Sequence, residues 1–158
     1  MRTGMMLMFA LASASLVACG GKQSGGDTAA GGTSGGSATT LFASLGGEPA
    51  VKAVVKDFVE EEVAKDSRIN AFFANTTDLP AFEQKLYDQI CEAAGGPCKY
   101  TGKDMKTAHA GMHIKQADFD ALVEDLVKTL DKFHVKDADK QALLGVLGPM
   151  KSDIVTAQ

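Results

Sequence analysis

Two of the chain's three histidines, His109 and His113, lie four residues apart in the stretch MKTAHAGMHI. A helix would place both imidazoles on one face, where they could bind one metal ion or act separately. No glutamate follows the first histidine as in a zinc protease helix, and a structural zinc ion requires four nitrogen or sulfur ligands. The residues alone leave three interpretations: a two-histidine metal site, one ligand beside a bystander, or two ordinary polar side chains.

Two cysteines, Cys91 and Cys98, are also spaced for chemistry, since they lie seven residues apart. In an oxidising compartment they could form a disulfide, and closing so short a loop would stabilise the fold by about 2–3 kcal/mol. The alternative is a pair of small buried thiols, because the separation of the two Cα atoms cannot be derived from sequence.

The beginning of the chain has the features of a bacterial secretory signal. Arg2 precedes an apolar run, and small residues then lead to Cys19. A helix that spans a membrane needs about 20 apolar residues, and this run is shorter. We therefore expect residues 1–18 to be a cleaved signal peptide. The segment LVAC, which ends at Cys19, resembles the lipobox of bacterial lipoproteins, and it predicts lipidation of that cysteine and attachment to a membrane.

Residues 19–40 are predicted to be the lipidated cysteine and a flexible tether. From residue 20 onward the stretch contains no aromatic residue and no Leu, Ile or Val, so it cannot bury enough apolar surface to offset the entropy of ordering. Gly20 rather than aspartate follows the cysteine, which favours the outer membrane. We therefore expect an extracytoplasmic, lipid-anchored protein that faces the periplasm or the cell surface, with a globular domain at residues 41–158.

The charge of the chain argues against nucleic acid as a partner. The formal net charge is −4, and the lysines and arginines do not form a dense basic cluster. Binding to phosphate backbones requires such a cluster.

The elements that must position these residues read as helices, because apolar residues recur at spacings of three and four and no strand pattern stands out. Asp78 is expected to cap one helix, and Pro149 should kink another. The sequence thus predicts an all-α domain. Its helices are expected at residues 49–65, 79–94, 115–133 and 137–155, with a short turn at 68–74 and a loop at 97–104.

Four segments carry a resemblance to a known family. They are LFASLGGEPAVKAVVKDF, INAFF, AAGGPCKYTGKDMKTAHAG and FDALVEDL, and they match the signature segments of group I truncated haemoglobins in order and spacing. The resemblance covers Leu41 to about Val155. It implies a truncated globin, which is a two-over-two helical sandwich around haem b and its iron.

By this resemblance, His109 would be the proximal ligand of the iron, and His113, where the family commonly has glycine, would be a bystander. A neutral imidazole should bind the iron through one nitrogen and donate to a backbone carbonyl through the other. The residues that the resemblance places around the haem are Phe58, Phe73, Phe82, Leu86, Ile114, Phe119 and Val123.

The distal side differs from the family pattern at Val59, where many members carry a tyrosine that donates to bound dioxygen. Valine cannot donate, so Lys85 and Gln89 are the candidate donors, since they lie on or beside the face of Phe82 and Leu86. Lys85 could instead ligate the iron, or the pocket could be largely apolar and favour NO or CO.

Tyr87, on the same predicted helix, is expected to point away from the pocket.

The implied function is the binding of dioxygen, NO or CO at haem iron. The resemblance also implies NO dioxygenation, which would depend on an external reductase. Two alternatives stay open. One is a haem-based electron-transfer or haem-carrying lipoprotein with a closed sixth site, and the other is a haem-free helical module for interactions in the cell envelope.

Overall fold

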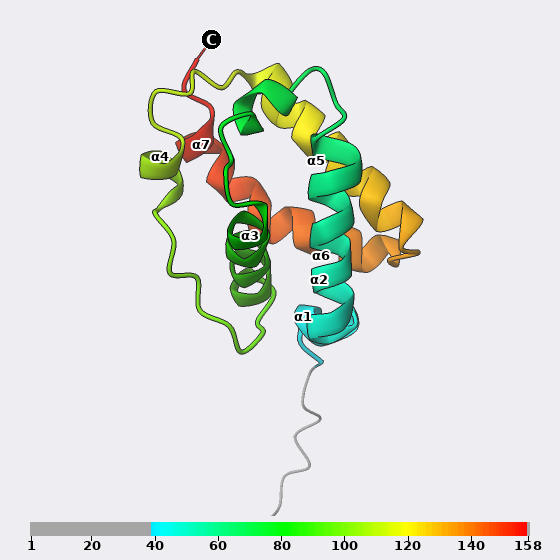
Figure 1. Ribbon diagram of the computed structural model, residues 1–158. Coiled ribbons are helices and arrows are strands. Elements are labelled where there is room, and N and C mark those ends of the chain that lie inside the picture. Colours follow the sequence, from blue (N-terminus) through cyan, green and yellow to red (C-terminus); the bar gives the residue numbers. More distant parts are fainter. Residues whose placement is uncertain (1–38, 158) are drawn as a thin grey trace, which may run out of the picture. The chain divides into compact units, whose positions relative to one another are not determined.

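The computed structural model describes residues 39–157, and every regular element in this range is a helix (Figure 1). The predicted all-α class is confirmed. The predicted signal peptide, the lipidation site Cys19 and all but the last two residues of the predicted tether lie outside the described residues. Within the described part of the chain, no helix has the length and apolar character needed to cross a membrane.

The order of the elements follows the predicted segments with two short additions, α1 and α4. The elements are α1 (Leu41–Ser44), α2 (Gly47–Asp57), η1 (Phe58–Val63), η2 (Asn70–Phe73), α3 (Leu79–Ala93), α4 (Met105–Ala108), α5 (Gln116–Lys132), α6 (Asp137–Leu147), η3 (Gly148–Met150) and α7 (Lys151–Ile154).

The predicted helix at residues 49–65 is present, but its last part is a π-helix. In η1, the backbone N–H of Ala64 donates to the carbonyl of Val59 at 3.1 Å, a bond that spans five residues. Phe58, Val59 and Val63 of this π-helix are all buried. Apolar periodicity predicted the helix, but it cannot distinguish a π-turn from an α-turn.

Helix α3 begins and ends where its sequence predicts. The Asp78 carboxylate accepts from the backbone N–H of Ala81 at 3.0 Å, which caps the first turn. The chain then leaves the helix through Gly95, which has a φ of +77°, and Gly96. A Cβ atom at Gly96 would stand 2.6 Å from Cys91 Sγ, so only glycine fits this close approach.

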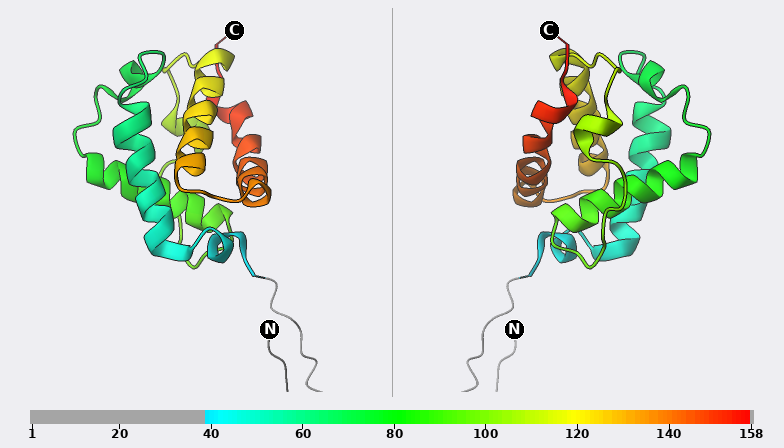
Figure 2. Two further views of the ribbon diagram at one scale, coloured as in Figure 1. Left: turned by 90° about the vertical axis from the view of Figure 1, so that its right-hand side faces the viewer. Right: turned by 90° about the vertical axis from the view of Figure 1, so that its left-hand side faces the viewer.

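The packing of the helices joins segments from the beginning and the end of the described range. Helix α2 packs on α3, η1 packs on α5, and α6 packs on α1 and α3. Figure 2 shows α5 running opposite to the stretch from α6 to α7, and α4 packs on α7. The predicted kink at Pro149 is confirmed, because α6 ends at Leu147 and η3 separates it from α7.

Candidate functional site

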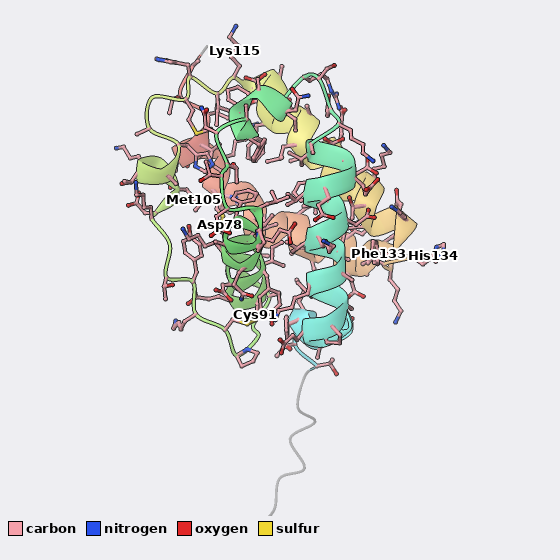
Figure 3. All side chains as sticks on the ribbon, viewed as in Figure 1. Asp78, Cys91, Met105, Lys115, Phe133 and His134 are labelled. Atoms are coloured by element: carbon pink, nitrogen blue, oxygen red, sulfur yellow. A yellow bond between two sulfur atoms is a disulfide. The ribbon has the colours of Figure 1, made fainter. Side chains whose placement is uncertain are left out.

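A cavity of about 740 Å³ lies among η1, η2, α3, α5 and the segment that contains α4. Its size falls in the range of about 300–1,000 Å³ that is usual for cofactor and ligand pockets. Most of the side chains around it are aliphatic or aromatic. Figure 3 shows Met105, at the start of α4, on the side of this space away from α5.

The structure brings the predicted site residues together around this one cavity. The lining includes the histidine, the residues expected to contact haem and those expected on the distal side: His109, Phe58, Phe73, Phe82, Leu86, Ile114, Phe119, Val123, Val59, Lys85 and Gln89. Residues from four elements (η1, η2, α3 and α5) and from the connection that follows α4 therefore converge, although they span more than 60 positions of the sequence.

One wall of the cavity is built from aromatic and aliphatic side chains. Phe73 comes from η2 and Phe82 from α3, and their rings meet edge to face with centroids 5.7 Å apart. Leu86 lies one helical turn beyond Phe82, and Phe58 and Val59 face the same space from η1. This wall has no hydrogen-bond donor in its side chains.

His109 caps the C-terminal end of α4, and its ring has a defined tautomer. The Nδ1 atom lies 2.7 Å from the backbone carbonyl oxygen of Met105. A carbonyl oxygen can only accept, so Nδ1 carries the hydrogen, and in the neutral ring the lone pair is on Nε2. The predicted hydrogen bond to a backbone carbonyl is therefore present, and the neutral ring would offer Nε2 to a metal ion.

His113 does not share this environment. It is exposed and does not line the cavity. Its φ is +53°, and Gly111, two residues earlier, has a φ of +77°. Helix α4 ends at Ala108, so the two histidines are not on one helical face. The two-histidine metal site is excluded as the structure stands, and His109 is left as the single candidate ligand.

The segment that carries His109 is tied to the rest of the domain at both ends. Asp104 caps α4 by accepting from the backbone N–H of Thr107 at 2.9 Å, and this bond holds the pKa of the Asp104 carboxyl below its usual value. Beyond the histidine, the carbonyl of Ile114 accepts from the backbone N–H groups of Thr156 and Ala157, both at 3.0 Å.

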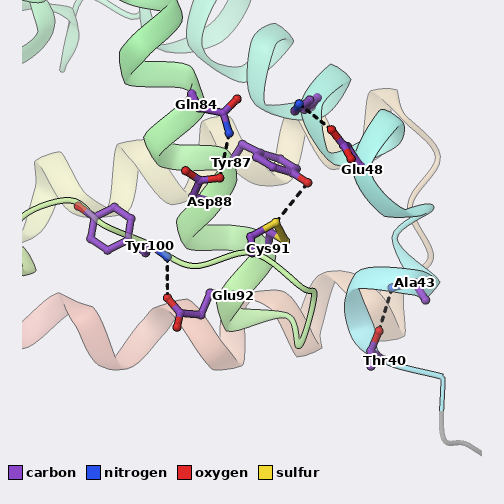
Figure 4. The surroundings of a disulfide bond; sticks show 11 residues. Thr40, Ala43, Glu48, Gln84, Tyr87, Asp88, Cys91, Glu92 and Tyr100 are labelled. Carbon is purple, nitrogen blue, oxygen red and sulfur yellow. Dashed lines mark hydrogen bonds and ion pairs between the residues drawn. A yellow bond between two sulfur atoms is a disulfide. The ribbon is translucent and has the colours of Figure 1, made fainter.

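The loop between α3 and α4 is fastened by a disulfide between Cys91 and Cys98, whose Cα atoms are 5.7 Å apart (Figure 4). Next to it, the Glu92 carboxylate pairs with Lys99 and accepts from the backbone N–H of Tyr100 at 2.9 Å. Lys99 first, and then Tyr100, lower the pKa of Glu92. The loop at residues 97–104, for which the sequence showed no apolar periodicity, is thus held against α3.

The hydroxyl of Tyr87 lies 3.3 Å from Cys98 Sγ, on the side of α3 that faces the disulfide. The side chain is buried and does not line the cavity, as the sequence predicted.

Gln89 and Lys85 differ in where their polar ends lie. The amide nitrogen of Gln89 lies 3.0 Å from Met105 Sδ and 3.3 Å from Met150 Sδ, so it faces the segment that holds His109. Lys85 is exposed, lines the cavity and has no ion-pair partner among residues 39–157. Of the two candidate distal donors, only Gln89 has a hydrogen bond on the histidine side within the part of the chain that the structure describes.

Several lining residues were not predicted. They include Tyr100 and Lys103 from the loop, and the methionines Met105, Met112 and Met150. Methionine is unbranched and fits irregular gaps, so it leaves no periodic pattern. One signal was available, because these three are the only methionines after residue 8 and two of them flank His109 closely in sequence.

Residues 40–156 match the profile of the family described as bacterial-like globin. A group 1 truncated haemoglobin of Tetrahymena pyriformis is 40% identical over 99 residues, which cover 63% of this chain and 80% of the relative. This chain belongs to the bacterial-like globins, as a group I truncated haemoglobin. A group 1 truncated haemoglobin of Nostoc sp. shares 32% identity with this globin over 117 residues, or 74% of this chain and 98% of the relative.

Solved structures agree with the fold of this globin. The truncated haemoglobin of Tetrahymena pyriformis in its Fe(III) form has a TM-score of 0.70 at 36% identity, and the match covers 73% of this chain and 97% of that one. The 2/2 haemoglobin of Synechococcus sp. with covalently attached haem has a TM-score of 0.68 at 30% identity, over 73% and 98% of the two chains. The predicted two-over-two fold is confirmed, and the predicted cofactor, haem, is that of the family.

The cavity of this globin suits a haem. A porphyrin is a broad apolar ring, and the cavity offers apolar walls on η1, α3 and α5. The iron requires a neutral nitrogen ligand, and with the hydrogen on Nδ1, beside the carbonyl of Met105, the neutral ring of His109 offers Nε2.

Proposed function

We propose that this globin binds haem b in the cavity, that Nε2 of His109 would hold its iron as the proximal ligand, and that the bound haem would take up a diatomic gas. Haem-based binding of diatomic gases is the general property of the family. The observation that carries the assignment of the ligand is the 2.7 Å contact between His109 Nδ1 and the carbonyl of Met105, because it fixes both the tautomer and the direction of the ring.

Different residues of the cavity would have different roles. When bound, the haem supplies an iron centre that coordinates a gas reversibly. His109 would hold the iron, Phe73 and Phe82 would pack on the ring, and Phe58 and Val59 would keep water from the side where the gas binds. Lys103, which also lines the cavity, would offer a positive charge to the carboxylates of the haem.

The distal wall supports a preference among gases. Val59 carries no donor, and the amide of Gln89 is engaged with two methionine sulfurs on the histidine side. Bound dioxygen gains from a hydrogen bond, which is worth about 1 kcal/mol for a neutral donor and somewhat more for a charged one. Lys85 is then the donor that could supply it, and without Lys85 the pocket would favour NO and CO.

The test is an absorption spectrum of the purified protein, supplied with hemin, in its ferric, ferrous and CO-bound forms. We expect an intense Soret band that moves on reduction and again on addition of CO. His109→Ala should abolish the proximal bond, and this variant should therefore not show the absorption spectrum of the wild type. A colourless wild-type protein would instead support the haem-free envelope module.

A second candidate is electron transfer or haem carriage with Lys85 as the sixth ligand. The position of Lys85 on the cavity wall, without an ion-pair partner in the described range, favours it. Ligation requires the neutral amine, so protons would compete with the iron as pH falls. The ferric protein should then be low-spin at high pH and lose this state on acidification, whereas Lys85→Met should be high-spin throughout.

NO dioxygenation and membrane attachment complete the proposal. The first would need an external reductase, so without a reductant each dioxygen-loaded haem should consume one NO, and further consumption should occur only while a reductant is supplied. The second is supported by the LVAC segment before the glycine-rich stretch. We expect the full chain to fractionate with membranes and the variant Cys19→Ser to lose this attachment.

A further inference from the structure

We propose that Gln89 is a positioning residue for the proximal histidine, and that it acts through Met105. The inference rests on the proposed function, because it concerns the bond between His109 and the haem iron. It also assigns to Gln89 a place on the proximal side, where the sequence suggested a distal donor.

The contacts of the amide group carry the proposal. Gln89 is half-buried on α3, and its Nε2 atom lies 3.0 Å from Met105 Sδ and 3.3 Å from Met150 Sδ. A thioether sulfur accepts hydrogen bonds weakly and cannot donate, so the nitrogen rather than the oxygen of the amide belongs beside it. The two hydrogens of the amide match the two sulfurs, and one side chain of α3 thereby joins α4 to η3.

Helix α4 needs such support. It has four residues, none of them is buried, and a helix this short is not stable by itself. Its capping by Asp104 fixes one end, and it packs on α7. Met105 is the residue through which α3 reaches it, since Gln89 contacts the Met105 sulfur.

The effect reaches the histidine because the carbonyl and the sulfur belong to the same residue. Gln89 holds the side chain of Met105, and the carbonyl of Met105 accepts from His109 Nδ1 at 2.7 Å. An acceptor on the outer nitrogen makes the imidazole a stronger ligand and fixes its ring. Loosening Met105 therefore lengthens or misaligns that hydrogen bond and weakens the bond between His109 and iron.

The experiment compares Gln89→Met with Gln84→Met in the full haem-loaded chain. Both glutamines lie on α3, but Gln84 is exposed, donates to Asp88 at 2.8 Å and does not line the cavity, so it is a matched control. Resonance Raman spectra of the ferrous protein report the stretching frequency between iron and the histidine. We expect Gln89→Met to lower this frequency and to speed haem loss to an acceptor protein by about tenfold, the lower end for an outer partner of a ligand. Gln84→Met should change neither.

A double-mutant cycle tests the route through Met105. Met105→Leu keeps the carbonyl and a similar volume but removes the sulfur, so Gln89→Met should add little to its effect. Gln89→Glu provides a second variant of nearly the same shape, whose carboxylate cannot donate to sulfur, and it should also lower the frequency.

Two outcomes overturn the inference. One is an unchanged iron–histidine frequency in both Gln89 variants, and the other is full additivity with Met105→Leu. Faster loss of dioxygen without a change in that frequency would place Gln89 on the distal side and would overturn it as well. A wild-type protein that takes up no hemin, and therefore shows no iron–histidine band, would refute the proposed function itself, and this is seen before any variant is compared.

Discussion

The Nδ1 atom of His109 and the backbone carbonyl oxygen of Met105 are 2.7 Å apart, and both belong to the short segment around α4. The bond is local, since it spans four residues, but the position of that segment is not. It depends on the disulfide at the end of α3, on the cap by Asp104 and on the C-terminal residues that bind Ile114. The chemistry proposed for one imidazole is thus prepared by contacts from residues that precede and follow it in the chain.

Removing this imidazole should leave a vacancy that a free imidazole can fill. Glycine at position 109 deletes the ligand but keeps the apolar walls, so the haem should still enter and lack its proximal bond. We expect added imidazole to restore the ferrous and CO-bound spectra of the wild type in a saturable way. Alanine at position 113 is the control, because His113 is exposed and outside the cavity lining, and it should not alter the spectra. Equal loss of haem binding in both variants would contradict the assignment.

Restoring a donor at Val59 should slow the loss of dioxygen. Val59 is buried and lines the cavity, so the hydroxyl of Val59→Tyr would enter the same space. A hydrogen bond of about 1 kcal/mol corresponds to a roughly fivefold slower dissociation. Val59→Phe adds the ring without the hydroxyl, and the ratio of the two dissociation rates, measured by stopped flow, isolates the donor. Equal rates in the two variants would show that the new hydroxyl does not reach the bound gas.

The disulfide should matter for stability and for the histidine together. Cys91 and Cys98 enclose a short loop, and replacing both with alanine should cost about 2–3 kcal/mol of the free energy of unfolding. The variant should also lose haem faster, because the loop that follows Cys98 leads to α4. Chemical unfolding of the oxidised wild type, the reduced wild type and the double variant measures this, and the last two should behave alike. A reduced wild type as stable as the oxidised one would refute the prediction.

Much of the fold could be predicted because its signals are local. The apolar spacing along α5, the cap at Asp78 and the break at Pro149 each depend on a few neighbouring residues, and the structure has all three elements. The π-turn at Phe58 could not be predicted, because α- and π-turns bury nearly the same apolar stripe.

The site could be predicted only as far as the family pattern extends. That pattern pointed to residues that the cavity brings together, but it contained no information on where polar ends lie. Helical spacing put Gln89 near the face of Leu86, yet the direction of its amide depends on Met150, 61 residues away. No pattern along the chain encodes such a contact.

Asp125 is a buried carboxyl on α5 that lies outside the site. Burial has the largest effect on the pKa of Asp125 and raises it, and the nearby negative charge of Asp66 raises it further. The guanidinium of Arg68, 4.0 Å away, lowers this pKa but does not cancel the rise. Its Oδ2 atom is buried and has no hydrogen-bond partner in the described part of the chain. The folded state therefore holds a proton on this group more tightly than the unfolded chain does, and stability falls as pH rises from the unfolded pKa of about 3.9 through the raised pKa.

Asp125→Asn supplies the neutral form at every pH, and its amide can donate to Asp66. We expect it to stabilise the protein at pH 7 by about 0.5–1.5 kcal/mol, the usual worth of one hydrogen bond. The gain should shrink as pH falls and disappear near pH 3, where the wild-type carboxyl is protonated in both states. Thermal unfolding at several pH values measures this. Glu124→Gln is the control, since Glu124 is exposed and paired with Arg68 at 2.7 Å, and it should bring no gain. If Asp125→Asn still raised the free energy of unfolding at low pH, the gain could not come from removing the charge of the carboxyl, and the prediction would be wrong.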